Sequence, residues 1–319
     1  MNLSEFEIIK LANKYFSYID NKDIVKSIGD DCAVIKNNSN YFQVMTSDIL
    51  IEKNHFLFEK ITPYNLGWKS LAVNISDIAS MGAFPRYALL SLGINKKVNY
   101  NWLEEFYKGI LDCSKKYDCY VIGGDTVFSD LIVVNFSVIG YTNKPIYRKE
   151  IKNDYVLVTT DYHGYSGIGL YLILKNQDIE DNIFLEKHYK PVPRVNEALF
   201  LKDNVEDFCM MDTSDGLYQS IKFMCNNKYG FIFNSNNSWI DKKIVDFCNK
   251  NNLSYMDFIL FGGEDYELSI AMSYNDYLNI KDKYYKNFGK ELILVGKFTN
   301  EAGIIYSNKS IEDKTFNHF

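Results

Sequence analysis

The stretch LGWKSLAVNISDIASMG, residues 66–82, predicts a helix that is buried around much of its circumference. Apolar residues recur in it at helical spacing, and a second stripe is polar. The two stripes are Leu71, Ile75 and Ile78, and Ser70, Asn74 and Asp77. An isolated charge is costly to bury, so a carboxylate on such a helix needs a partner. Asp77 is therefore the first residue of this chain for which an ordinary structural explanation is hard to find.

Strand-like and helical runs alternate on both sides of this helix. Apolar, β-branched runs predict strands at 41–50, 87–94, 131–141, 155–160 and 265–273. Between the third and the fourth of them lies a polar stretch with a proline, 142–154, which is the best candidate for a linker. We therefore expect an α/β fold of the α+β type, with two domains at 1–145 and 146–319.

The composition limits the classes of partner. The 319 residues carry a formal net charge of −6, whereas nucleic-acid-binding surfaces are basic, so no nucleic acid is expected. No run reaches the roughly 18 apolar residues of a membrane span, and the N-terminus lacks the pattern of a signal peptide. The six cysteines are scattered without a CxxC pair, which favours buried thiols in a reducing compartment. We expect a cytoplasmic protein without a membrane partner.

Aspartates recur where an apolar strand or helix meets a turn. They are Asp30, Asp31, Asp48, Asp77, Asp125, Asp212, Asp215 and Asp265. Taken singly, each of them other than Asp77 is explained as a helix cap or a turn residue. As a converging set they would repel, by about 4 kcal/mol for two charges ~4 Å apart at an effective dielectric of ~20. Few Lys or Arg lie inside these motifs to offset that repulsion, so divalent cations are the alternative.

Carboxylates accompanied by Ser and Thr hydroxyls suit Mg²⁺ better than Zn²⁺. Mg²⁺ held by carboxylates usually also holds substrate phosphates, which indicates a nucleotide. The chain has no GxxxxGK[ST] motif and no protein-kinase pattern. The stretch GYSGIG, 164–169, offers only a loose glycine-rich turn whose amides could meet phosphate. The residues alone thus predict Mg²⁺-dependent phosphate chemistry without a P-loop.

Six motifs together resemble the thiamine-monophosphate kinases, of the superfamily that includes aminoimidazole ribonucleotide synthetase and selenophosphate synthetase. They are GDDCAVI (29–35), TSDILIEKNHF (46–56), GWKSLAVNISDIASMGAFP (67–85), GGDT (123–126), MDTSDGL (211–217) and GGEDYEL (262–268). The resemblance implies a homodimer formed by N-terminal mixed-sheet domains, each followed by a C-terminal α/β domain, with ATP in the cleft between the two domains. It also implies transfer of the γ-phosphoryl group of ATP to thiamine monophosphate, assisted by several Mg²⁺ ions.

The same resemblance implies roles for residues at matched positions. The Mg²⁺ ligands would be Asp31, Asp48, Asp77, Asp125, Asp212 and Asp215, assisted by Thr46 and Ser47. ATP would contact Tyr107, Gly124, Arg148 and Ser214, and the acceptor would contact His55, Glu264 and Phe316. The attacking phosphate oxygen is already ionised, so no residue is assigned as a catalytic base. Asp30 is a weaker candidate that would orient a neighbouring ligand.

Several alternatives stay open at this point. Tyr107 could be a core residue of its helix, His55 a structural histidine and Arg148 a solvated linker residue. Arg194 could be structural or lie beside a phosphate. Tyr165 stands where the family commonly has Asp, so a phosphate or metal contact made by that Asp would be altered. The chain could also be a related ATP-dependent synthetase or dehydratase, or a Mg²⁺-nucleotide-binding protein without catalytic activity.

Overall fold

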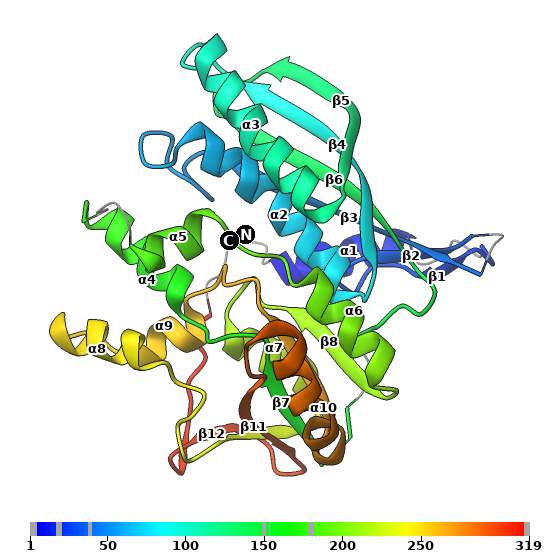
Figure 1. Cartoon of the computed structure of the whole chain (residues 1–319), viewed down its shortest axis with the longest axis vertical. Coiled ribbons are helices and arrows are strands. Elements are labelled where there is room, and N and C mark those ends of the chain that lie inside the picture. Colours follow the sequence, from blue (N-terminus) through cyan, green and yellow to red (C-terminus); the bar gives the residue numbers. More distant parts are fainter. Residues whose placement is uncertain are drawn as a thin grey trace.

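The computed structural model of the chain contains two mixed β-sheets, one in each half of the sequence. It describes residues 5–16, 21–37, 40–148, 151–152, 154–177 and 182–315. Figure 1 shows the first half of the chain, in blue to cyan-green, above the second half, in green to red. The predicted α/β class is confirmed.

The first sheet has six strands in the order β1-β2-β3-β6-β4-β5. Their bounds are β1 (Ile24–Lys26), β2 (Ala33–Lys36), β3 (Phe42–Ile51), β4 (Phe84–Ile94), β5 (Tyr120–Phe128) and β6 (Val133–Thr142). Only β4 and β5 pair in parallel, and the other neighbours are antiparallel. Burial alternates along β6, so one face of the sheet is covered and the other is more open.

The covered face packs against α2 (Pro63–Ser80), which includes all but the last two residues of the stretch 66–82. Thr62 caps this helix by accepting a hydrogen bond from the amide of Asn65, and Pro63 occupies its first turn. α2 contacts β3 and β6 on one side and the helix α3 (Tyr100–Tyr117) on another. It also contacts the second half of the chain, which explains why nearly all of its residues are buried.

Two glycines allow α2 and α3 to approach closely. A Cβ atom added to Gly67 would lie 2.0 Å from the carbonyl oxygen of Phe106. One added to Gly109 would lie 1.9 Å from the carbonyl oxygen of Tyr64. No side chain larger than hydrogen fits between these backbones, so the crossing of the two helices depends on glycine at both positions.

The second sheet has seven strands in the order β13-β12-β9-β11-β7-β10-β8. Their bounds are β7 (Tyr155–Thr159), β8 (Phe208–Asp212), β9 (Gly230–Phe233), β10 (Leu268–Ser273), β11 (Ile293–Thr299), β12 (Ile304–Tyr306) and β13 (Lys309–Ser310). Only β9 and β12 pair in parallel. The first sheet ends at Thr142 and the second begins at Tyr155, so the predicted domain boundary at 145/146 falls between them and stays a prediction.

The remaining helices, apart from the N-terminal one, lie in the second half of the chain (Figure 1). They are α1 (Glu5–Phe16), α4 (Tyr165–Leu174), α5 (Ile183–Tyr189), α6 (Val195–Asn204), α7 (Leu217–Cys225), α8 (Lys242–Lys250), α9 (Tyr255–Phe261) and α10 (Tyr274–Phe288). Among the described helices, none is long and apolar enough to cross a membrane.

One hydrophobic cluster joins the two halves. It contains Leu71 and Ile75 of α2 together with Met210 of β8 and Ile270 of β10. A second cluster lies within the second half and includes Phe231 and Phe298. All six cysteines are buried and free, as predicted from their scattered positions. The first cluster holds α2 between the two sheets, and this placement positions the site.

Candidate active site

Three of the predicted carboxylates converge where α2 meets the two sheets. Asp31 lies in the turn before β2, Asp77 on α2 and Asp212 at the end of β8. One carboxylate oxygen from each lies within 4.8 Å of the others, a spacing that suits a shared metal ion. Residues separated by up to 181 positions thus form one cluster, which we call the acid cluster.

Each carboxylate of the acid cluster accepts a hydrogen bond from a hydroxyl group. Thr46 donates to Asp77 at 2.5 Å, Ser76 to Asp212 at 2.7 Å and Ser80 to Asp31 at 2.7 Å. Thr46 was predicted, whereas Ser76 and Ser80 were not. No local pattern singled them out, because nearly every position of this helix is buried. These hydroxyls fix the orientation of the three acids.

Mutual repulsion and burial disfavour ionised acids here. Burial, then Asp48 and Asp212, raise the pKa of Asp77 well above its usual value. Burial, then Asp215, raise the pKa of Asp48 to about 6. Burial is also the main cause that raises the pKa of Asp212 to about 6, against the lowering effects of Ser76 and Arg148. The cluster therefore lacks enough positive charge of its own, and a bound cation would supply it.

Arg148 and Asp30 lie beside the acid cluster. The guanidinium of Arg148 pairs with Asp31 and stacks over the ring of Phe223, 5.3 Å from its centroid. Its backbone amide donates to both carboxylate oxygens of Asp30, at 3.3 and 3.2 Å. Asp30 also pairs with Lys26 at 3.5 Å. Arg148 is thus a half-buried residue of the site rather than a solvated linker residue.

The motifs that contain Asp215 and Glu264 are joined by backbone hydrogen bonds. The amide of Glu264 donates to the carbonyl of Ser214 at 2.6 Å, and that of Tyr266 donates to Thr213 at 3.0 Å. Gly263, Glu264 and Tyr266 all have φ between 51° and 65°, a region that side chains disfavour. This strained segment fixes Glu264 and Tyr266 next to the turn that carries Ser214 and the exposed Asp215.

Ser47 and Asp125 are not brought to the acid cluster within one chain. Side chains alternate along β3, so Thr46 faces α2 while Ser47 points to the opposite face of the sheet. There Ser47 accepts a hydrogen bond from Asn135 at 3.0 Å. Asp125 is exposed on the edge strand β5, three strands from β3, or about 14 Å at ~4.8 Å per strand.

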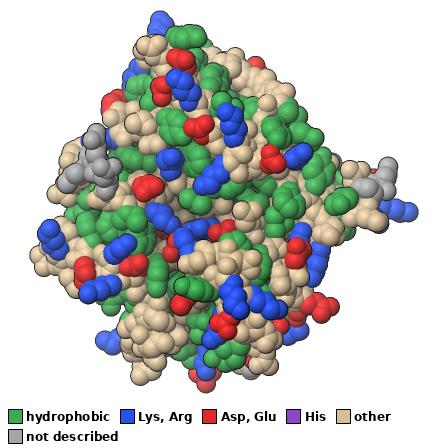
Figure 2. Space-filling model, viewed as in Figure 1, with side chains coloured by type: hydrophobic (Ala, Val, Ile, Leu, Met, Phe, Trp, Pro, Cys, Tyr) green, Lys and Arg blue, Asp and Glu red, His purple; other side chains and the backbone are tan. Residues whose placement is uncertain are grey.

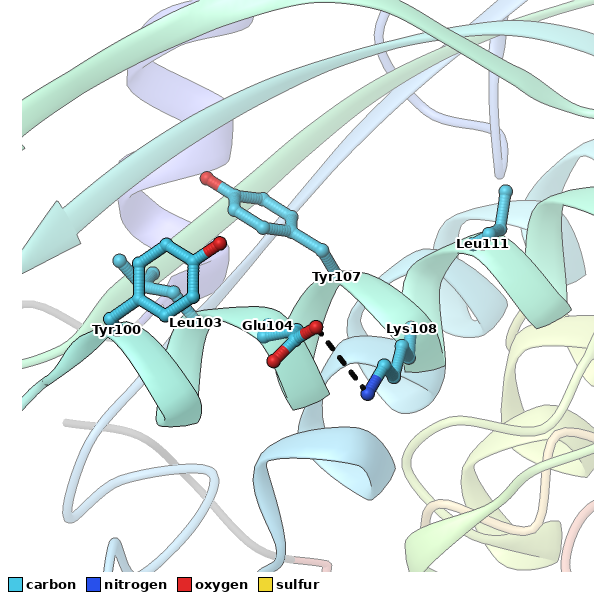
Figure 3. Close-up of a pocket in the computed structure, with 6 residues that line it drawn as sticks. All are labelled: Tyr100, Leu103, Glu104, Tyr107, Lys108 and Leu111. Atoms are coloured by element: carbon cyan, nitrogen blue, oxygen red, sulfur yellow. Dashed lines mark ion pairs between the residues drawn. The ribbon is translucent and has the colours of Figure 1, made fainter.

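Tyr107 lines an open cavity of about 410 Å³ on α3. Figure 3 shows the rings of Tyr100 and Tyr107 on the same side of the helix, with Glu104 and Lys108 paired beside them. Tyr107 is 46% exposed, so it is not the core residue that its helix could have made it. Gly124 lies on β5, where a Cβ atom would approach the carbonyl oxygen of Leu90 to 1.7 Å.

Comparison with known proteins places the chain in a family. Residues 29–142 match the family model for AIR synthase related protein, N-terminal domain. Over 95% of its length the chain is 33% identical to the thiamine-monophosphate kinase of Methanocaldococcus jannaschii, and the match covers 96% of that protein. The thiamine-monophosphate kinase of Buchnera aphidicola (subsp. Acyrthosiphon pisum) is 34% identical, with both chains covered completely.

The chain belongs to the thiamine-monophosphate kinase family. This membership confirms the predicted resemblance and the predicted class of enzyme, a kinase. Among solved structures, AaThiL complexed with AMPPCP and TMP superposes with a TM-score of 0.86 at 25% identity. That match covers 100% of this chain and 99% of the other.

Two of the acceptor-contacting residues predicted from the kinase family are described, and the third, Phe316, lies outside the described residues. The ring nitrogen Nδ1 of His55 accepts a hydrogen bond from the amide of Ile51 at 3.0 Å, which fixes the orientation of the ring. Glu264 forms an ion pair at 3.1 Å with Lys69. Lys69 is a buried residue of α2, and no role was predicted for it from the sequence. Although burial raises the pKa of Glu264, the charge of Lys69 holds it below its usual value.

The glycine-rich turn before α4 is occupied by a residue of the protein itself. The amides of Gly164 and Ser166 donate to the carboxylate of Asp265 at 2.7 and 3.0 Å. These amides are therefore not free to meet phosphate, which removes the weakest phosphate site considered from the sequence. Tyr165 packs its ring 5.2 Å from that of Phe184 and donates to Asp241 at 2.7 Å.

Arg194, for which a structural role or one beside a phosphate was open, forms a buried ion pair. Its guanidinium donates two hydrogen bonds to Glu267, at 2.7 and 2.6 Å. The hydroxyl of Thr160 donates to the same carboxylate at 2.7 Å. Because both charges are satisfied within the protein, the structural role is favoured.

Proposed function

We propose that this chain transfers the γ-phosphoryl group of ATP directly to thiamine monophosphate, forming thiamine diphosphate. The observation that carries the proposal is the convergence of Asp31, Asp77 and Asp212, with one carboxylate oxygen of each within 4.8 Å of the others, in a member of the kinase family. The similarity to AaThiL complexed with AMPPCP and TMP supports the same pair of substrates. The ATP site would lie in the cleft between the two predicted domains.

The donor groups of the acid cluster fit Mg²⁺. They are carboxylate oxygens oriented by hydroxyls, and their raised pKa values reflect an excess of negative charge. We infer that Asp31, Asp48, Asp77, Asp212 and Asp215 hold several Mg²⁺ ions, with Thr46 assisting. When bound, Mg²⁺ neutralises phosphate charge and keeps the attacking and leaving oxygens in line.

The residues of the chain bind and orient the substrates rather than move a proton. Arg148 would exchange Asp31 for a phosphate oxygen of ATP, to which its planar guanidinium is suited. Ser214 would contact the nucleotide from the turn that precedes α7, and His55 and Glu264 would contact the acceptor. Because the attacking phosphate oxygen is already ionised, positioning supplies most of the rate enhancement.

We also propose a homodimer built on the exposed face and edge of the first sheet. Every residue of β5 is exposed, including Ile122 at 61% and Phe128 at 68%. An apolar edge strand left open in this way favours pairing with another chain. A second copy would bring its own Asp125 to the face that carries Ser47, which would reconcile the predicted roles of both residues. Tyr107 and Gly124 of the second copy would likewise contact the ATP bound by the first copy.

The assay for the proposed function follows thiamine diphosphate by chromatography after incubation of the protein with ATP, Mg²⁺ and thiamine monophosphate. We expect stoichiometric formation of ADP and thiamine diphosphate, with no reaction when Mg²⁺ is chelated. Folded protein that binds ATP and forms no product would contradict the proposal. That result would favour a synthetase relative or a non-catalytic nucleotide-binding protein. We also propose a cytoplasmic location for this chain, because its six cysteines are buried and free.

The shared site is tested by co-expressing two inactive variants, Asp77→Asn and Asp125→Asn. If each site combines Asp77 of one copy with Asp125 of its partner, a mixed dimer contains one intact site. Random pairing then restores about a quarter of the wild-type activity, whereas each variant alone stays inactive. Mixtures no more active than the separate variants would show that the two residues act within one chain, or that no dimer forms.

A further inference from the structure

Lys69 and Glu264 form a pair of opposite charges at the edge of the site. The Lys69 side chain is 1% exposed and that of Glu264 25%, so the pair is buried at one end and open at the other. The distance from Nζ to Oε1 is 3.1 Å, but Nζ has no hydrogen-bond partner of suitable geometry in the described part of the chain. An ammonium group has three donors, and leaving them unfilled in the interior is costly.

Among the described residues, no other cation satisfies Glu264 in the same way. His188 lies 3.5 Å from the second carboxylate oxygen, and its Nδ1 is 3.0 Å from the hydroxyl of Ser166. Burial, then the charge of Lys69, lower the pKa of His188 to about 3, so its ring is neutral near pH 7. His55 also acts electrostatically on Glu264, more weakly than Lys69. Lys69 is therefore the principal positive charge facing this carboxylate.

The pair borders the acid cluster. Lys69 precedes Asp77 by eight residues on α2, which is about 12 Å along the helix axis. Tyr266 is influenced by both groups. Burial raises the pKa of its hydroxyl well above the usual value, and this pKa is raised further by Glu264 and by the carboxylates of Asp48, Asp212 and Asp77. Figure 2 shows Lys and Arg side chains next to Asp and Glu side chains in the hollowed middle of the face that is turned to the viewer in Figure 1.

We propose that Lys69 completes the acceptor site: it binds the phosphate of the acceptor, while Glu264, which is already expected to contact the acceptor, binds its cationic ring. The inference rests on the proposed function, since thiamine monophosphate carries both a phosphate and a positively charged thiazolium ring. On binding, the internal pair separates. Lys69 exchanges the carboxylate of Glu264 for the phosphate of the acceptor, and Glu264 exchanges the ammonium of Lys69 for the cationic ring. Neither charge is left unpaired in the interior.

This arrangement makes the phosphate a determinant of specificity. Thiamine has the cationic ring but no phosphate, so it would pair with Glu264 and leave Lys69 buried without a counter-charge. A site built to bind a polar group rejects an analogue that lacks it, because the polar group of the protein is then unsatisfied. We expect the protein to bind thiamine monophosphate at least about tenfold more tightly than thiamine, the ratio expected from one charged hydrogen bond.

The test measures binding of thiamine monophosphate and of thiamine by calorimetry, with the protein loaded with Mg²⁺ and AMPPCP so that no transfer occurs. Lys69→Met removes the ammonium and keeps an apolar side chain of similar length. It should lower the preference for thiamine monophosphate over thiamine about tenfold or more, because the phosphate loses its partner and thiamine no longer leaves a buried ammonium without a counter-charge. Glu264→Gln should weaken both ligands by a similar factor and preserve their ratio. Lys69→Arg should keep most of the preference.

An unchanged ratio of the two affinities in Lys69→Met would overturn the proposal, whether both affinities fall together or neither changes. If Lys69→Met fails to fold, Lys69→Met/Glu264→Gln removes both charges, and it should also lose the preference. The outcomes for the proposed function are separate. Wild-type protein that forms no thiamine diphosphate yet shows this pattern retains the recognition site. If the wild type forms thiamine diphosphate and Lys69→Met keeps the ratio of the two affinities, the proposed function holds and the recognition role of Lys69 is wrong.

Discussion

Asp77→Asn is expected to lose most of the kinase activity, by about 100-fold or more in kcat, while the protein stays folded. Asp77 lies at the centre of the acid cluster and accepts the hydroxyl hydrogen bond of Thr46, a bond that the amide oxygen of Asn can also accept. The amide preserves shape but removes the charge that would hold Mg²⁺. Steady-state rates at saturating ATP and thiamine monophosphate measure the effect.

The same variant is expected to be more stable than the wild type when Mg²⁺ is absent. Burial and the neighbouring acids raise the pKa of Asp77, so its ionised form destabilises the fold at pH values above its unfolded pKa. A neutral amide removes this cost, and the melting temperature should rise by about 2–4 °C for each kcal/mol gained. Asp112→Asn is the matched control, because Asp112 is exposed on α3, outside the acid cluster, and its carboxylate accepts a hydrogen bond from the hydroxyl of Tyr64. Near-wild-type activity of Asp77→Asn would mean that the acid cluster is not the metal site.

The second large effect is a reversal of the pH dependence of stability by Mg²⁺. The pKa values of Asp48 and Asp212 in the fold are about 6, above the usual 3.8. Without metal, the stability contributed by their protonated forms is present below the unfolded pKa and is lost as pH rises towards and through about 6. With Mg²⁺ the ionised forms are the ones that bind, so the metal stabilises the protein most above that range.

Melting temperatures measured at about pH 5 and about pH 7.5, with and without Mg²⁺, test this expectation. The increase caused by Mg²⁺ should be clearly larger at the higher pH. Asp212→Asn serves as the control, since it removes one of the two titrating acids and should reduce the difference. An increase of equal size at both pH values would indicate that Mg²⁺ binds elsewhere on the protein.

The sequence predicted the acid cluster because its members stand at recognisable places. Asp31, Asp77 and Asp212 each occur where an apolar element meets a turn or a buried face, and the surrounding motifs carry the family resemblance. Composition and periodicity were sufficient for the α/β class, since strand and helix periods differ. The alternation of side chains along β3 was also available from the sequence and separates Thr46 from Ser47.

The sequence did not reveal the roles of Ser76, Ser80 and Lys69. On a helix buried on all sides, every position looks alike, and only the packing of α2 against both halves of the chain determines what each residue meets. Ser76 meets Asp212, which is 136 residues away, and Lys69 meets a carboxylate on a segment with positive φ. Such contacts depend on long-range packing and have no local signature.

The sequence by itself determined which chemical groups the site contains: carboxylates, hydroxyls and few local cations, in the motifs of one kinase family. Only the tertiary structure decided which of them lie together. The strand order β3-β6-β4-β5 places Asp125 of β5 three strands away from β3, which carries the Thr46 that bonds the acid cluster. Both strands belong to motifs of the same family. Strand order follows from pairing between distant segments, and local sequence patterns specify each strand without specifying its neighbour.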